Sequence, residues 1–183
     1  FSGSLPIFVL TAWFSTAIAG LYSFGFTMIF RPMNLITTAL SQVFSQRVIS
    51  RANDGQPILD DVRRLFIKMV QFSILPFGIV AVFAPAIFRV VFGPEWETAG
   101  EYTRILIPWL FVVFLSAPFA FLPDLFKKQG TALLIDIIKL SLRAAALFVG
   151  VYIDNIFVTL ILLSGVSFAV IVCQIFWYFN LAK

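Results

Sequence analysis

Uncharged stretches separated by short charged segments dominate this chain. The six longest uncharged stretches are residues 1–30, 32–46, 69–88, 105–123, 144–153 and 155–182. A helix that crosses a bilayer needs about 20 predominantly apolar residues. Backbone groups that face lipid must also be hydrogen-bonded within their own segment, which open strands do not achieve. The pattern therefore predicts an all-α transmembrane helical bundle.

Turn signals divide these stretches into about six predicted helices. The apolar run before Arg31 is too long for one crossing, and Ser15-Thr16 offers a turn within it. A polar linker over 51–60 contains Asn-Asp-Gly and Pro, which are typical of turns. The expected helices cover 5–14, 20–50, 60–91, 98–124, 131–152 and 154–181, and Pro118 lies inside the fourth.

The chain is expected to form a single transmembrane domain over residues 1–183. It begins at Phe1 rather than at Met, and Phe1 already lies within an apolar run. We therefore expect the first helix to lack its first turns. The chain is then expected to be a piece of a longer protein.

Composition supports the membrane prediction and excludes other classes. Hydrophobic residues make up 61% of the chain and charged residues 12%, with 23 Phe, whereas soluble domains are about 45 to 50% apolar and about 25% charged. The absence of His and the single Cys argue against a metal site or a disulfide framework. The net charge of +4 comes from scattered basic residues, so no nucleic-acid partner is expected.

Basic residues predict the orientation of the helices. If the helices alternate in direction, one side carries Arg47, Arg51, Arg63, Arg64, Lys68, Lys127, Lys128 and Lys183, and the other carries Arg89 and Arg104. Short loops rich in Lys and Arg stay in the cytoplasm. The linker over 51–60 and the carboxyl end are therefore expected on the cytoplasmic side of a multi-pass membrane protein.

Four charged residues lie in the interiors of predicted helices, away from the two membrane faces, where charge is costly and usually functional. Arg31 interrupts the second helix, where it either faces a cavity or partner, lies closer to an interface, or pairs with a carboxylate. Asp136, Lys139 and Arg143 follow at helical spacing on one face of the fifth helix. Asp136 and Lys139 are close enough to the cytoplasmic end to reach the interface. Arg143 either joins a packed salt bridge or faces a cavity as a substrate contact.

The balance of these interior charges bears on the substrate. Three of the four are basic and one is acidic. A site that carries cations would be expected to offer carboxylates, whereas an excess of basic groups favours an anionic substrate such as a phosphate.

Several short motifs resemble one membrane family in order and spacing. They are Leu21-Tyr22-Ser23, Pro32-Met33-x-Leu35-Ile36, Ala39-x-Ser41-Gln42-Val43-Phe44, Val91-Phe92-Gly93-x-x-Trp96-x-x-Ala99-Gly100, Ile105-Leu106-x-Pro108-Trp109 and Lys128-Gln129-Gly130. Together they resemble the carboxyl-terminal half of bacterial polysaccharide flippases. These are the O-antigen and capsule repeat-unit translocases of the multidrug/oligosaccharidyl-lipid/polysaccharide superfamily, which are relatives of the MATE exporters.

The resemblance implies a transporter of two six-helix lobes around a central cavity, of which this chain is the second. Members move an undecaprenyl-diphosphate-linked oligosaccharide across the bacterial inner membrane by alternating access, for lipopolysaccharide and other surface polysaccharides. The partners implied are this anionic lipid-linked substrate, the lipid bilayer and the missing amino-terminal lobe. Relatives often place Arg five residues before the Pro that matches Pro32, where this chain has Thr27. Arg31, one turn further on, is expected to take over that role.

We therefore expect a transporter rather than an enzyme, with no cofactor. The substrate-binding candidates are Arg31, Arg143, Lys139 and Thr27, and Asp136 is the candidate for ion coupling. The alternative is a cation-coupled drug or metabolite exporter of the MATE type, which would need an essential carboxylate. A membrane enzyme would be expected to show clustered acids or His in a sizeable loop, which this sequence lacks.

Overall fold

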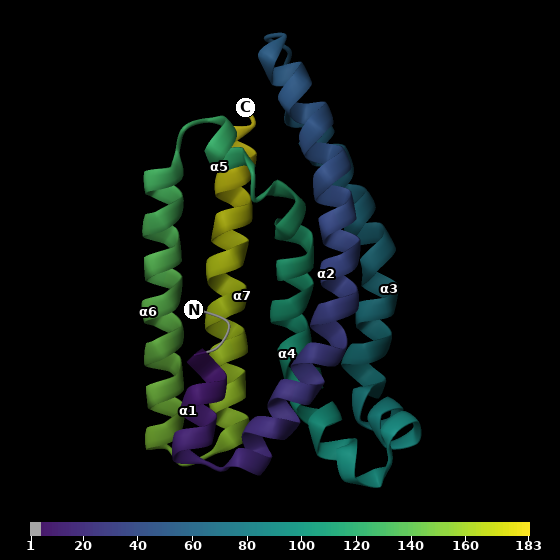
Figure 1. Cartoon of the computed structure of the whole chain (residues 1–183), viewed down its shortest axis with the longest axis vertical. Coiled ribbons are helices and arrows are strands. Elements are labelled where there is room, and N and C mark those ends of the chain that lie inside the picture. The colour runs from purple at the N-terminus through teal and green to yellow at the C-terminus, as the bar shows by residue number, and fades with distance from the viewer. Residues whose placement is uncertain (1–4) are drawn as a thin grey trace.

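The computed structural model describes residues 5–183 as a bundle of helices (Figure 1). In chain order the elements are α1 (Leu5–Trp13), α2 (Thr16–Asn53), α3 (Leu59–Phe92), the 3-10 turn η1 (Pro94–Trp96), α4 (Glu97–Ser116), the 3-10 turn η2 (Ala117–Phe119), α5 (Leu122–Leu125), α6 (Gln129–Tyr152) and α7 (Ile156–Leu181). The all-α prediction is confirmed. The expectation about the start of the chain at Phe1 lies outside the described residues.

Helix starts follow local capping chemistry. The Ser15 hydroxyl accepts a hydrogen bond from the Ile18 backbone N–H at 3.1 Å and caps α2. As a result α2 begins at Thr16, four residues before the predicted position, because a capping hydroxyl starts a helix more effectively than Gly20 does. The Asn155 side chain caps α7 in the same way, through the N–H groups of Phe157 and Val158.

The prediction of one helix over 98–124 is wrong. α4 ends at Ser116, and η2 and the short α5 follow as separate elements. Pro118 lies within η2 instead of inside a helix, and Pro123 lies in the first turn of α5. Proline lacks a backbone N–H and its ring clashes with the preceding turn, so closely spaced prolines end a helix.

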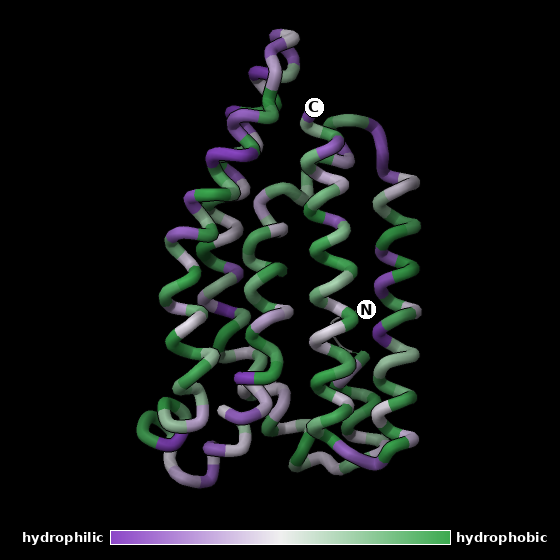
Figure 2. Tube along the Cα trace, turned by 180° about the vertical axis from the view of Figure 1, so that it is seen from behind, coloured by the Kyte–Doolittle hydropathy of each residue, from purple (hydrophilic) through white to green (hydrophobic). Residues whose placement is uncertain are grey.

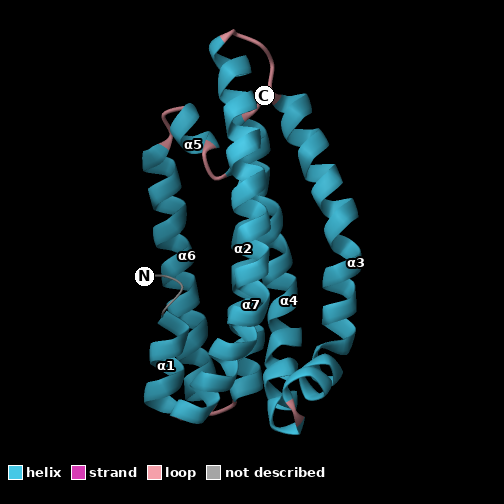
Figure 3. Ribbon diagram, turned by 45° about the vertical axis from the view of Figure 1, so that its right-hand side comes forward, coloured by secondary structure: helices cyan, strands magenta, loops and turns pink. Residues whose placement is uncertain are grey.

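α4 is the centre of the bundle, and it packs against α2, α3 and α7. Two glycines permit these close approaches. A Cβ on Gly100 would lie 2.6 Å from the backbone oxygen of Ala84 in α3, and one on Gly25 in α2 would lie 2.8 Å from that of Ala99. α6 and α3 form the two outer sides of the bundle (Figures 1 and 3).

Among residues 5–183, three helical segments are long and apolar enough to cross a membrane, namely Leu59–Phe92, Pro94–Leu125 and Ile156–Leu181. α2 and α6 have 38 and 24 residues, but polar and charged side chains interrupt them. Figure 2 shows that the middle of the bundle is mostly hydrophobic, whereas the tip of the α2–α3 hairpin is hydrophilic.

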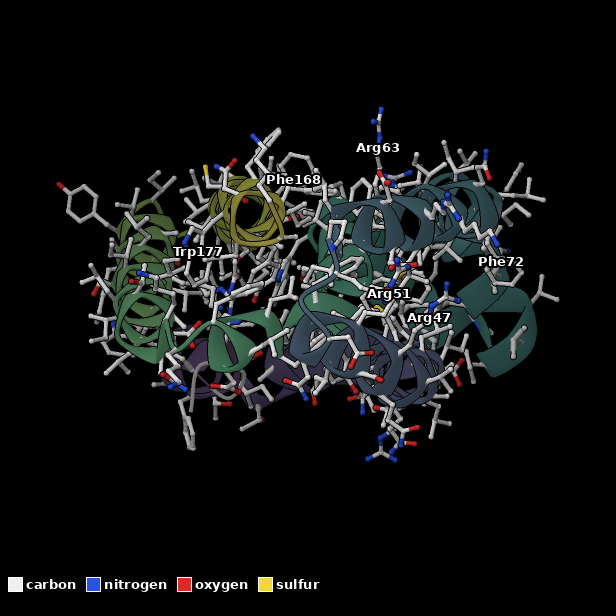
Figure 4. All side chains as sticks on the ribbon, turned by 90° about the horizontal axis from the view of Figure 1, so that it is seen from above. Arg47, Arg51, Arg63, Phe72, Phe168 and Trp177 are labelled. Carbon is white, nitrogen blue, oxygen red and sulfur yellow. The ribbon has the colours of Figure 1, made fainter. Side chains whose placement is uncertain are left out.

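The α2–α3 hairpin extends beyond the rest of the bundle (Figure 1). Its tip, the turn after α5 and the carboxyl end lie toward the same end of the molecule, as the alternating-helix prediction requires. Asp61 joins the two helices there, because it is buried and pairs with both Arg47 and Arg51. Arg51 also donates a hydrogen bond to the Gln56 side chain at 3.0 Å. Seen from above, Arg47 and Arg51 lie between α2 and α3, and Arg63 points away (Figure 4).

Candidate functional site

A groove of about 690 Å³ lies between α4, α6 and α7, and α2 contributes to it. Its lining includes Phe26 and Phe30 of α2, Trp109, Leu110 and Val113 of α4, Asp136, Lys139, Leu140 and Arg143 of α6, and Ile171 and Gln174 of α7. A second hollow of about 480 Å³ shares Ser116, Leu133, Asp136, Lys139 and Gln174 with it. The two hollows therefore adjoin, and the second reaches α5, at the end predicted to be cytoplasmic.

Arg143 lies on the wall of this groove and is 6% exposed. Its guanidinium lies over the Trp109 ring, 4.6 Å from the ring centroid, and its Nε donates a hydrogen bond to the Ser167 hydroxyl at 2.8 Å. Stacking on an aromatic face and a hydrogen bond at one nitrogen hold a guanidinium in a fixed plane. The groove thus contains an oriented cation.

Trp109, which also lines the groove, carries a buried hydrogen-bond donor. Its side chain is 5% exposed, and its indole Nε1 has no hydrogen-bond partner among residues 5–183. Burying an N–H without a partner costs about 1 to 3 kcal/mol. A donor left in this state beside an arginine is suited to a ligand oxygen or a water molecule.

Lys139 and Asp136 form an ion pair nearer the open end of the groove. The Lys139 side chain is 18% exposed, whereas that of Asp136 is 59% exposed. On α7, opposite them, the Gln174 amide donates to the Tyr178 hydroxyl at 2.8 Å. This part of the groove is therefore polar on two helices, and its charges balance.

Thr27 and Arg31 lie on α2, one position after each of the groove residues Phe26 and Phe30. This offset places them on the adjoining face of the helix. Arg31 is exposed, and within 5–183 it makes no ion pair. The structure thus brings Lys139, Asp136 and Arg143 together in the groove and leaves Thr27 and Arg31 beside it.

A polar stripe follows the same face along α2. Its members recur at spacings of three and four and are Ser23, Thr27, Arg31, Asn34, Thr38, Ser41 and Ser45. None of them is fully buried in the described structure, and the Ser41 hydroxyl bonds back to the Thr37 carbonyl at 2.7 Å. Against lipid such a stripe is unfavourable, so its presence indicates a side of α2 that faces water or protein.

Sequence reasoning singled out the charged residues and missed their neighbours. The stripe on α2 was readable, because its spacing is visible in the sequence once each Ser and Thr is placed on a helical wheel. Trp109, Ser167 and Gln174 carry no such local signal. They belong to the groove because α4, α6 and α7 meet, and that is a tertiary contact.

A helical membrane bundle with a charged groove defines the class of this protein, and the comparisons define its family. The family described as polysaccharide biosynthesis protein matches residues 1–101. This match covers more than half of the chain, so the chain belongs to that family.

A curated relative points in the same direction. The chain is 26% identical over 94 residues to the amylovoran biosynthesis protein AmsL of Erwinia amylovora. The aligned part is 49% of this chain and 23% of AmsL, so the chain matches less than a quarter of that protein's length. No solved structure matches the chain.

Proposed function

We propose that this chain is one lobe of a flippase that moves a lipid-linked oligosaccharide across the bacterial inner membrane, and that the α4–α6–α7 groove receives its diphosphate. The membership in a polysaccharide biosynthesis family supports the pathway. The oriented Arg143 is the observation that carries the substrate assignment, because charge-assisted hydrogen bonds to phosphate are among the strongest available.

The groove offers the diphosphate several donors in sequence. Lys139 lies between the open end and Arg143, and the Arg143 guanidinium lies over the Trp109 ring. Asp136 neutralises Lys139, so an arriving phosphate competes with that carboxylate for the ammonium. Arg143 then supplies the net positive charge at the inner end.

The polar stripe of α2 supports a path for the oligosaccharide. Sugar hydroxyls need hydrogen-bond partners throughout a membrane crossing. Thr27, Asn34 and Thr38 provide such partners along the helix, and Arg31 adds a second cation beside the groove. In this proposal the stripe faces the rest of the transporter, and rocking of this lobe against it exposes the groove to each side of the membrane in turn.

The test uses a deletion strain that expresses the full-length gene, with surface polysaccharide measured at matched protein level. Arg143→Ala is expected to lower polysaccharide about tenfold or more, since hydrogen bonds to a charged group contribute about 1.5 to 3 kcal/mol. Arg143→Lys keeps the charge and should restore part of the loss. Arg104→Ala is the matched control, because Arg104 is exposed and lies on the opposite side of α4 from the groove.

Other variants separate this proposal from cation-coupled export. Asp136→Asn is expected to keep more than half of the polysaccharide, whereas a coupling carboxylate would be essential. Arg31→Ala is expected to reduce polysaccharide less than Arg143→Ala does. The substrate assignment is overturned if Arg31→Ala and Arg143→Ala both leave polysaccharide at the wild-type level.

A further inference from the structure

The outer face of α3 changes abruptly from apolar to basic. Twenty residues from Met69 to Phe88 carry no charge, and Lys68 and Arg89 bound them. At 1.5 Å per residue this segment is about 30 Å long, which is the thickness of a bilayer's hydrocarbon core. The sequence of α3 therefore fixes its depth in the membrane.

Three exposed basic residues lie just above this segment, at the end that carries the hairpin. Lys68 lies at its boundary, and Arg64 and Arg63 lie about 6 to 8 Å further along the helix axis. The headgroup layer on each side of a bilayer is of that thickness, about 5 to 8 Å. All three side chains are therefore at the level of lipid headgroups.

The basic residues continue the lipid-facing side of the helix. Arg64, Lys68, Phe72, Leu75 and Ile79 follow one another at spacings of four, four, three and four, so they share one face. Phe72 is 71% exposed and Leu75 is 69% exposed. Phe72 points away from the bundle (Figure 4). A lipid whose acyl chain lies along Phe72 and Leu75 therefore has its headgroup beside Lys68 and Arg64.

Nearby carboxylates do not cancel this charge. Asp61 is buried and pairs with Arg47 and Arg51 of α2. Asp60 is exposed one turn before Arg64, beyond the headgroup level. Within 5–183, Arg63, Arg64 and Lys68 form no ion pair with a carboxylate.

We propose that Arg64 and Lys68, together with Arg63 at the same depth on the neighbouring face of α3, form a binding site for the headgroup of an anionic phospholipid. Basic residues next to a membrane-spanning helix attract anionic lipid with about 1 kcal/mol each. The site lies on α3, away from the groove, and does not depend on the transported substrate.

The experiment titrates the purified full chain in detergent with phosphatidylglycerol or with phosphatidylcholine of the same acyl chains, and counts bound lipids by native mass spectrometry. The wild type should bind phosphatidylglycerol more tightly, and the variant R63A/R64A/K68A should lose most of this preference, about fivefold for each charge removed. The control K127A/K128A/K183A removes three basic residues from the same end and should keep the preference. R63K/R64K keeps the charge and should bind as the wild type does.

Thermal unfolding in detergent shows that each variant is folded. If R63A/R64A/K68A unfolds early, the comparison uses R63Q/R64Q, which removes two charges and keeps a polar side chain at both positions. Equal binding of the two lipids by the wild type would overturn the proposal. So would an unchanged preference in the alanine variant, or an equal loss in the control.

Discussion

α3 and α6 form opposite sides of the bundle and distribute their charges in opposite ways. In α3 the charges lie at the two ends of an uncharged segment, and the exposed face of that segment is apolar. In α6 the charged residues Asp136, Lys139 and Arg143 lie within the helix rather than at its ends, and all three line the groove. An outer position in the bundle therefore does not decide how polar a helix is. What decides it is whether the face in question meets lipid or the groove.

The largest expected effect comes from introducing an arginine on α3 and, in a second variant, on α6. Ile79→Arg places a charge near the middle of the lipid-facing side of α3 and should cost about 2.5 to 3.5 kcal/mol of insertion free energy. Leu140→Arg adds the same charge to the groove wall of α6 and should cost much less. Protease protection of the full chain in membranes measures the inserted fraction. Equal losses for both variants would contradict the contrast between the two faces.

A smaller effect is expected where α6 meets α7. A Cβ on Gly150 would lie 2.6 Å from the Thr159 Cα, so Gly150→Ala must push the helices apart and should destabilise the fold by about 1 to 3 kcal/mol. Gly165→Ala is the control, since nothing lies within 4 Å of that position. It should stabilise α7 by up to about 1 kcal/mol. Unfolding in detergent, monitored by circular dichroism, gives both free energies of unfolding. If Gly150→Ala leaves the free energy of unfolding unchanged, the contact between α6 and α7 is looser than the structure shows.

The smallest effect concerns one ion pair on each side, in each of which the carboxylate is exposed. Arg89 at the end of α3 pairs with Glu97 at 3.5 Å, and Lys139 pairs with Asp136 on α6. Glu97→Gln and Asp136→Asn should each change the free energy of unfolding by less than about 1 kcal/mol, because exposed pairs contribute little. The same unfolding measurement checks this. A loss of about 2 kcal/mol or more for Asp136→Asn would instead assign the Lys139–Asp136 pair a structural role.

Much of the helical architecture could be predicted from the sequence, because hydropathy and turn residues are local signals. The ends of α3, α6 and α7 fall within two residues of the predicted positions. The break at Ser116 was not predicted, because an uncharged run hides a proline-driven stop when the surrounding residues are equally apolar.

The candidate site was less predictable. Arg143 and its neighbours on α6 stood out because charge is rare within an apolar helix. Their arrangement around Trp109 and Ser167 depends on how three helices meet, and no spacing along the chain encodes that. Arg31 was equally conspicuous in the sequence, yet the structure places it beside the groove on the exposed side of α2.

The central position of α4 has a mechanical consequence. α4 packs against α7, which supports the groove, and against α3, which carries the basic side chains at headgroup level. A change in the tilt of α4 would therefore move both the groove wall and α3, because α4 contacts both. A change in the thickness or charge of the surrounding bilayer that shifted α3 would then reach the groove through these contacts of α4.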